Sequence, residues 1–341
     1  MSGRLKLRRG LVVDEDPLTV EVDGERRPAW ADQALLGEMR EGDEVIVNVA
    51  ALDLGLGSGG FDVIHVNLTR GLEASGEGRE HVIKLNYTSL QHPIEPVELP
   101  SETGERSIPV LILPLHGHLA PAAWATAQSS PGLRVGYVQT AGGALPGSLS
   151  RDVVQLRERD LLCGHVTAAP AYGGEHEALS VAGALDAAAN DLGWDAAIVG
   201  PGPGIIGSET RLGHGGMAAL DNAHAALALG LPTLLSPRLS EADPRERHQG
   251  VSHHTLTVLE LLLGGVEVPV PECHPDVASQ LTDAAGDRHQ LHKAQPDLAG
   301  YAASGLSSRV MGRGIEEDRL FFAAALAAGN ALGVSSAGGV G

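Results

Sequence analysis

The stretch that decides the fold is AAIVGPGPGIIGSETRLGHGGM, residues 196–217. Its first four residues are apolar, and they predict a buried strand of a parallel sheet. The run then breaks into a segment with glycines at positions 200, 202, 204, 207, 213, 215 and 216. Glycine lets the backbone adopt positive φ and approach a ligand closely, and successive amides in such a loop can converge on an anion. The stretch therefore indicates a strand that leads into a ligand-binding loop.

The same order of strand, loop and helix recurs on both sides of this stretch. Apolar runs predict strands at residues 110–115, 133–139, 165–169, 196–199 and 232–236. Helical patterns follow them at residues 120–128, 149–162, 175–192, 217–229 and 252–263. This alternation predicts an α/β domain over residues 108–332, with a doubly wound and mostly parallel sheet. Residues 270–314 show little periodicity, residues 316–331 predict a last helix, and residues 333–341 predict a disordered tail.

The first part of the chain has a different pattern. Short branched runs at residues 11–13, 18–22 and 45–49, and an alternating run at 61–67, predict β-strands separated by turn residues. We interpret residues 1–98 as a small β-barrel domain, followed by a proline-containing linker at residues 91–107. A second glycine-rich stretch, residues 54–60, is interpreted as a hairpin connection rather than a ligand site.

Composition excludes several classes of function. The 341 residues include 24 Lys and Arg against 43 Asp and Glu, a formal net charge of −19, which argues against nonspecific binding to nucleic acid. Two cysteines cannot build a disulfide framework, so a reducing compartment is favoured. The basic start leads into no apolar signal segment, and the best apolar run, residues 256–270, is too short and too interrupted to span a membrane. We expect a cytoplasmic protein.

Every predicted strand of the α/β domain ends in a polar or glycine-rich loop. Because the carboxyl ends of parallel strands meet at one edge of a sheet, ligands bind in the crevice there. We therefore predict a site for a small anionic ligand at that edge. The candidates for proton transfer are His116, His118, His248 and His254. The candidates for ligand binding are Gly142, Gly143, Tyr172, Gly173, Gly174, Gly202, Gly204, Gly207, Ser208, Thr210, Arg211, Arg238, Asp243, Arg245, Arg247 and His253.

Each motif has a simpler alternative. Residues 202–207 have the spacing of a dinucleotide fingerprint, but polar residues follow where the helix should begin. Ser208 and Glu209 stand where a phosphate-binding P-loop needs Lys and Ser or Thr. The loop could merely turn a strand into a helix. The arginines between residues 238 and 247 suit carboxylate or phosphate, but surface pairing with Glu241, Asp243 and Glu246 is the alternative.

The histidines raise the question of a metal. The sequence has no His-Glu-x-x-His pattern and no cysteine pair with zinc spacing, so we predict no metal site. The alternative set would be His116 and His118 together with Asp243, His248 or His254. His253 and His254 are adjacent, so on a helix they should diverge, and we expect at most one of them to face a ligand.

Five longer motifs resemble one known family. They are GPGIIGSETRLG from Gly202, ADPRERHQGVSHHT from Ala242, GGALP from Gly142, YGGEHE from Tyr172 and LGLGSGGFD from Leu54. With them, most of the chain resembles an uncharacterised, largely actinobacterial domain-of-unknown-function family, number three-eight-six-six. The resemblance implies no activity, cofactor or catalytic residue. At residues 208–210 the family pattern leads us to expect Thr-Gly-Thr, so Glu209 adds a carboxylate that weakens the phosphate interpretation.

Two functional hypotheses follow, from different classes. In the first, an enzyme acts on a phosphorylated or carboxylated compound: amides of residues 202–208 hold the anion, Arg211, Arg245 and Arg247 neutralise it, and histidines move protons. In the second, a non-catalytic ligand sensor or assembly protein binds a partner through its barrel. A structural metalloprotein is a third alternative. The sequence leaves the cofactor and the oligomeric state open, a homo-oligomer included.

Overall fold

The computed structural model describes residues 4–56, 59–72, 80–98 and 106–337. The chain forms two compact units, which divide between Ile94 and Glu95. We describe each unit by itself.

The first unit is a closed five-stranded barrel, which confirms the predicted fold of this region. Its strands, in barrel order, are β1 (Leu7–Glu15), β2 (Leu18–Val22), β3 (Glu25–Trp30), β5 (Asp62–Asn67) and β4 (Glu44–Asn48). Strand β1 closes the barrel because it pairs with both β2 and β4. Alternate residues such as Val12, Val20 and Val45 fill the interior. The short helices α1 (Gln33–Leu36) and α2 (Ala50–Asp53) and the hairpin of β6 (Val82–Lys84) and β7 (His92–Ile94) complete this unit.

The second unit is built on an eight-stranded sheet. In spatial order its strands are β11 (His176–Ala178), β10 (Gly164–Ala168), β9 (Val135–Thr140), β12 (Ala196–Pro201), β8 (Val110–Ile112), β13 (Thr233–Leu235), β16 (Glu267–Val270) and β17 (Gln290–Lys293). Each neighbouring pair is parallel. All carboxyl ends therefore lie at one edge of the sheet, and β12 and β8 occupy its centre.

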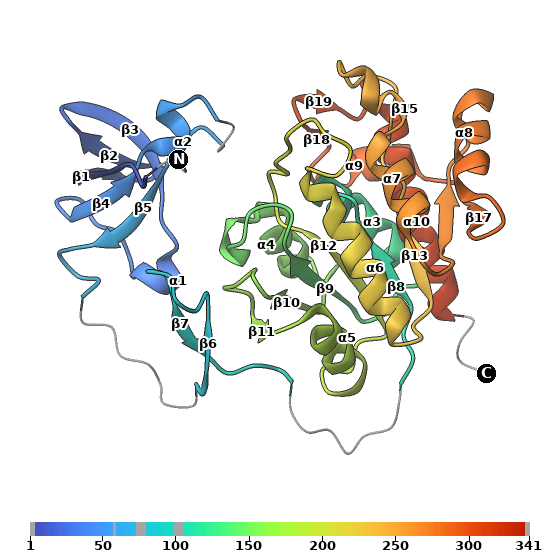
Figure 1. Cartoon of the computed structure of the whole chain (residues 1–341), viewed down its shortest axis with the longest axis horizontal. Coiled ribbons are helices and arrows are strands. Elements are labelled where there is room, and N and C mark those ends of the chain that lie inside the picture. Colours follow the sequence, from blue (N-terminus) through green and yellow to red (C-terminus); the bar gives the residue numbers. More distant parts are fainter. Residues whose placement is uncertain (1–3, 57–58, 73–79, 99–105, 338–341) are drawn as a thin grey trace. The chain divides into compact units, whose positions relative to one another are not determined.

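Helices cover both faces of this sheet (Figure 1), as a doubly wound fold requires. Val110 and Ile112 belong to the core that packs on α5 (Val181–Asn190), α6 (Ala218–Ala228), α7 (His253–Leu261) and α8 (Pro275–Ala285). Leu111 and Leu113 belong to the core that packs on α3 (Leu119–Ser129), α4 (Arg151–Glu158), α9 (Leu298–Ala303) and α10 (Arg319–Ala337). The central strands are apolar on both faces, which explains why they appear in the sequence as continuous hydrophobic runs.

Three details differ from the sequence-based expectations. The helix predicted at residues 175–192 is a short strand, β11, followed by α5, because the Ser180 hydroxyl caps α5 by accepting from the Gly183 amide at 2.9 Å. Residues 270–314 contain regular elements, among them α8, β17 and α9. Helix α10 continues to Ala337, so residues 333–337 are helical instead of belonging to a disordered tail. Residues 338–341 lie outside the described part of the chain.

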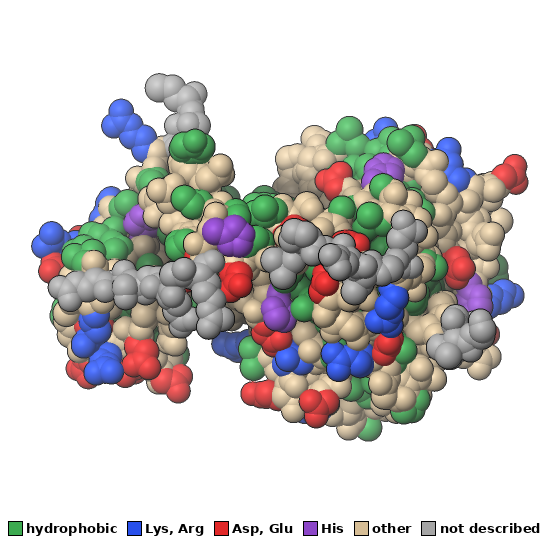
Figure 2. All heavy atoms as spheres, turned by 90° about the horizontal axis from the view of Figure 1, so that it is seen from below, with side chains coloured by type: hydrophobic (Ala, Val, Ile, Leu, Met, Phe, Trp, Pro, Cys, Tyr) green, Lys and Arg blue, Asp and Glu red, His purple; other side chains and the backbone are tan. Residues whose placement is uncertain are grey.

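Among the described residues, α10 is long and apolar enough to span a membrane, in its window Arg319–Ser336. In the structure 72% of that window is buried, because Phe321, Phe322 and Leu326 pack into the core. Its length and composition therefore reflect the interior of this unit. On the face shown in Figure 2, acidic and basic side chains lie interspersed.

The packing of α10 on α3 gives a prediction for Gly329. A Cβ atom at this position would lie 2.1 Å from the Ala122 carbonyl oxygen, and Thr126 Oγ1 donates to the Gly329 carbonyl at 2.9 Å. In an exposed helix, replacing Gly by Ala stabilises by about 1 kcal/mol. Here we expect Gly329→Ala to lower the free energy of unfolding by about 1–3 kcal/mol, because the helices must move apart. Urea denaturation followed by circular dichroism measures this, and an unchanged or raised stability would contradict the close packing.

Candidate functional site

The carboxyl edge of the sheet carries a pocket of about 610 Å³. Five parts of the chain line it: the turn η1 (His116–His118) after β8, the start of α4, the glycine-rich loop after β12, the segment after β13, and residues 307–311. The lining side chains that carry charge or titrate are Asp152, Glu209, His116, His214, His248, His253, His254, Arg238, Arg245, Arg247 and Arg309. The structure thus brings together loops that are far apart in the sequence.

A hairpin positions the arginines of the pocket. Strands β14 (Leu239–Ser240) and β15 (Gly250–Val251) pair in antiparallel fashion, and the Ser252 amide donates to the Arg238 carbonyl at 3.0 Å. Between them lies the turn η4 (Glu246–His248). Ser252 then begins α7 as its N-cap, accepting from the His254 amide at 3.2 Å. This hairpin holds Arg238, Arg245, Arg247 and His248 on one short segment.

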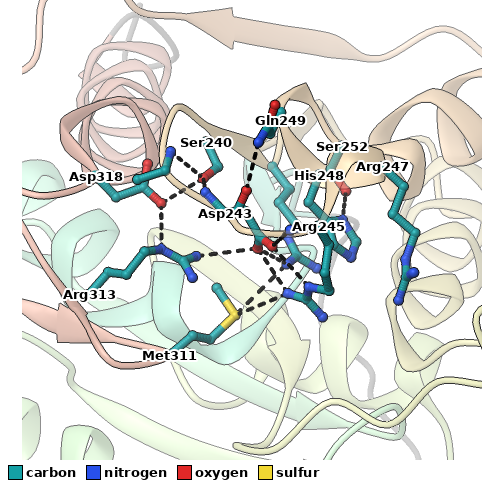
Figure 3. Close-up of polar contacts among 12 residues, drawn as sticks. Ser240, Asp243, Arg245, Arg247, His248, Gln249, Ser252, Met311, Arg313 and Asp318 are labelled. Carbon is teal, nitrogen blue, oxygen red and sulfur yellow. Dashed lines mark hydrogen bonds and ion pairs between the residues drawn. The ribbon is translucent and has the colours of Figure 1, made fainter.

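Three guanidinium groups converge on the buried carboxylate of Asp243 (Figure 3). Arg245 forms a two-pronged ion pair, with Nε 2.9 Å from Oδ1 and Nη2 2.8 Å from Oδ2. Nη2 of Arg238 and Nη2 of Arg313 each lie 3.3 Å from Oδ2. The Asp243 side chain has no solvent exposure, so these contacts form in a low-dielectric environment where the charges interact strongly.

A second carboxylate fixes this arrangement. Asp318 accepts from Arg313 Nε at 3.0 Å and from the Ser240 hydroxyl at 2.6 Å. The Ser240 oxygen in turn accepts from the Asp243 amide at 2.9 Å. The network ties α10 and the β18–β19 hairpin (Arg309–Val310 and Arg313–Gly314) to the arginine hairpin. Of the partners in the alternative of surface pairing, Asp243 does bind Arg238 and Arg245, but it does so as a buried carboxylate and not at the surface.

The network leaves positive charge without a partner. Three guanidinium groups contact the two carboxylates of Asp243 and Asp318, and Arg238 is 3% exposed. Burial, reinforced by the charge of Arg245, lowers the pKa of Arg238 to about 10, so it remains protonated at neutral pH. Nε of Arg238 is buried and has no hydrogen-bond partner among the described residues. The excess charge lines the pocket, where an anion could neutralise it.

Four histidine rings form an adjacent wall. His254 stacks on His214 with ring centroids 3.6 Å apart, and the rings of His253 and His254 are 4.4 Å apart. The His248 ring lies 5.0 Å from His253, and its Nδ1 is 2.7 Å from the Ser252 hydroxyl. Burial lowers the pKa of His248 to about 3, and the charge of Arg238 acts in the same direction. Burial likewise lowers the pKa of His254, so the positive charge of the pocket comes from arginine.

His116 also lines the pocket, and it lies in the turn η1 that follows β8. Its Nδ1 lies 3.2 Å from the Pro201 carbonyl and its Nε2 lies 2.8 Å from the Ser150 hydroxyl. Because the carbonyl can only accept, Nδ1 carries the proton and Nε2 accepts from Ser150. Burial lowers the pKa of His116. Ser150 also caps α4 by accepting from the Val153 amide at 3.1 Å.

The glycine-rich loop offers fewer free backbone amides to an anion than its sequence suggested. Gly204, Gly207 and Thr210 line the pocket. The Ser208 amide donates to the Gly213 carbonyl at 2.7 Å, and the Ser208 hydroxyl is 3.1 Å from Thr210 Oγ1, so Ser208 closes the loop on itself. Glu209 adopts φ +64° and forms an ion pair with Arg247 at 3.3 Å. The loop therefore provides a wall and a carboxylate, but its Ser208 amide is not free for an anion.

Three other glycines pack backbone against backbone and do not line the pocket. A Cβ atom at Gly143 would lie 2.0 Å from the Gly202 carbonyl oxygen, and one at Gly202 would lie 2.2 Å from the Ala144 carbonyl oxygen. Gly142 similarly abuts the Gly215 carbonyl, at 2.4 Å. Glycine is required here because the loops after β9 and β12 touch through their main chains. These residues position the loops and do not offer groups to a ligand.

Tyr172, Gly173 and Gly174 also lie outside the pocket lining. They follow β10, which β9 separates from β12 in the sheet. The Tyr172 carbonyl accepts from the Gly147 amide at 2.7 Å, and the Gly174 amide donates to Thr167 Oγ1 at 3.1 Å. Their polar backbone groups thus bind neighbouring loops.

Two side chains that the sequence placed at the site, His118 and Arg211, do not line the pocket. His118 is fully buried because residues 116–118 form a turn rather than extended chain, and its ring packs edge-on against Phe321 at 4.7 Å. Its Nδ1 lies 2.8 Å from the Ser236 hydroxyl. Arg211 forms an ion pair with Glu260 of α7 at 2.5 Å, outside the pocket lining. His116 and His118 therefore have different partners, and they do not form the metal set considered above.

The structure also adds residues that the sequence reasoning missed. His214 lies within the glycine-rich stretch itself, so its position was a usable signal. Arg309 and Met311 come from the segment without periodicity, where no pattern indicates that the chain returns to the pocket. Both His253 and His254 line the pocket, contrary to the expectation that at most one would. They occupy the first two positions of α7, whose N-terminus lies at the pocket.

His118 gives a prediction for the pH dependence of stability. Burial, with a smaller effect from Arg238, lowers its pKa from the ordinary value of 6.5 to about 3. Between these two values the unfolded chain binds a proton that the folded chain does not, so the free energy of unfolding must rise with pH. We expect His118→Gln to reduce that slope by up to about 1.4 kcal/mol per pH unit. Urea melts across this window measure it, with the exposed His292→Gln as control; equal slopes in both variants would contradict the prediction.

Comparison with known proteins places the chain in a family. No curated protein and no solved structure matched it. The profile of one family, described as "Protein of unknown function (DUF3866)", matches residues 28–329, which include the end of β3, strands β4 and β5 of the barrel, and nearly all of the α/β unit. The chain belongs to this family, DUF3866.

Proposed function

We propose that the α/β unit binds a small phosphorylated or carboxylated metabolite in the pocket at the carboxyl edge of its sheet. The observation that carries this proposal is the excess of guanidinium charge around Asp243, next to a hollow that a ligand can enter. Arginine presents a planar fork of donors that matches both carboxylate and phosphate groups. Arg245 and Arg247 line the pocket with partly exposed side chains, so they can offer such donors to a ligand.

The size and lining of the pocket suit a metabolite with an organic part. A volume of about 610 Å³ falls within the usual range for small-molecule sites. Ile205, Ile206 and Met311 supply apolar surface beside the charged groups. The net charge of −19 and the mixed charges of the surface in Figure 2 support a small anion rather than nucleic acid as the ligand. We place the protein in the cytoplasm on the same composition.

His116 supports an enzymatic role. Its Nδ1 donates to the Pro201 carbonyl, its Nε2 accepts from the Ser150 hydroxyl, and Asp152 lies 3.8 Å from Nε2. His116 lines the pocket, so a ligand hydroxyl that replaced Ser150 as the donor would meet the lone pair of Nε2. A neutral, oriented imidazole next to a bound anion is the arrangement that general base catalysis needs. The alternative is a sensor that binds the same metabolite without changing it.

Calorimetric titration with inorganic phosphate, pyrophosphate and a dicarboxylate tests the binding. We expect binding of at least one of these anions, and we expect Arg245→Ala to weaken it about 10-fold or more, since a hydrogen bond to a charged group contributes about 1.5–3 kcal/mol. Arg211→Ala is the matched control, because Arg211 lies outside the pocket and should leave affinity unchanged. Equal losses in both variants, or no binding of any anion, would contradict the proposal.

His116→Ala separates the enzyme from the sensor. Once a binding metabolite is known, nuclear magnetic resonance can follow its conversion by the wild-type chain and by the variant. An enzyme should convert the metabolite, and the variant should bind it but convert it about 100-fold more slowly, the usual loss for a general base. A wild-type chain that binds the metabolite and never changes it would establish the sensor instead.

A further inference from the structure

The histidine wall brings together three ring nitrogens from two segments. His214 comes from the loop after β12, whereas His253 and His254 begin α7. Each of the three residues offers one nitrogen, and these nitrogens all lie within 4.8 Å of one another. Packing alone rarely gathers several imidazoles around one point, because each must find a hydrogen-bond partner when it is buried.

The hydrogen bonding of His214 leaves one of its nitrogens available. Its Nε2 lies 2.9 Å from the Arg211 carbonyl oxygen, so Nε2 carries the proton. Nδ1 therefore carries a lone pair, and it is buried with no hydrogen-bond partner among the described residues. A histidine whose outer nitrogen donates to a backbone carbonyl is oriented as metal-binding histidines are.

The absence of a side chain at Gly216 keeps the space beside these rings open. A Cβ atom there would lie 2.7 Å from His254 Nδ1 and 3.0 Å from His214 Nδ1. Gly216 is not among the residues with positive φ, so no left-handed backbone demands glycine here. Glycine at this position is explained by the room that it leaves between the two Nδ1 atoms.

We propose that His214, His253 and His254 form a binding site for a divalent transition metal ion of the zinc class. Imidazole nitrogen suits Zn²⁺, Co²⁺ and Ni²⁺, whereas Mg²⁺ and Ca²⁺ prefer oxygen ligands. Three histidines leave at least one coordination position open, and all three side chains line the pocket, so that position would face the ligand. The site stands on the histidines alone and does not require the anion proposed above.

One nitrogen of the proposed metal site, His254 Nδ1, already has a hydrogen-bond partner. Arg238 Nη1 donates to His254 Nδ1 at 3.2 Å, and its charge repels a cation. Metal binding must therefore break this contact and let the stacked rings of His214 and His254 turn toward the ion. It follows that removing the Arg238 charge should not weaken metal binding, although it should weaken the binding of an anion.

Titration of the untagged, chelator-treated chain with Zn²⁺ and Co²⁺ tests this inference. We expect one ion per chain by calorimetry, a visible absorption band for bound Co²⁺, and no comparable binding of Mg²⁺. His214→Ala and His253→Ala should each lower the affinity by more than about 10-fold, since even changes next to metal ligands commonly cost that much. His292→Ala, at an exposed position outside the pocket, is the control.

Two further variants separate this inference from the proposed function. Gly216→Ala should weaken zinc binding because its methyl group enters the space beside the two nitrogens. Arg238→Gln should weaken phosphate binding and leave zinc binding equal or stronger. Absence of zinc binding, or equal affinity in His253→Ala and His292→Ala, would overturn the metal site and leave the anion pocket untouched. Zinc binding without binding of phosphate, pyrophosphate or the dicarboxylate would retain the metal site and remove the proposed function.

Discussion

The pocket of this protein depends on one buried carboxylate, that of Asp243. It accepts from three guanidinium groups, and without it Arg238, Arg245 and Arg313 would repel one another in a largely desolvated space. The carboxylate stabilises the three guanidinium groups, but its single negative charge cannot neutralise all three. Removing one partner of such a buried pair typically costs about 3–5 kcal/mol, so the network both holds the local fold and retains positive charge.

The sheet explains why this charge lies where a ligand can reach it. Parallel strands with helices on both faces force every strand-to-helix loop of the unit to one edge. At that edge β12 and β8 are neighbours, so the glycine-rich loop and His116 share a wall. The hairpin after β13 then adds the arginines, and the segment before α10 closes the hollow with Arg309 and Met311. The strand order thus determines where the pocket lies, and the side chains of a few loops determine what it can bind.

The sequence revealed five of the eight strands and the edge at which they end, because buried parallel strands are continuous apolar runs and their loops are rich in glycine and charge. It missed β11, β16 and β17, which lie toward the two ends of the sheet. It could not reveal the strand order. Tyr172, Gly173 and Gly174 looked like ligand residues, but β9 separates their loop from β12. His118 looked like a partner of His116 because the turn at residues 116–118 was not foreseen. Met311 was missed because only tertiary packing brings residues 307–311 back to the pocket.

The most direct measurement is a crystal structure of the protein soaked with tungstate, an electron-dense analogue of phosphate. The account predicts an anomalous peak in the pocket, within hydrogen-bond distance of Arg245 and of Arg238, with Asp243 still paired to Arg313. An empty pocket, or tungstate bound only at arginines outside it, would show that the positive charge around Asp243 serves the fold alone and would contradict the account.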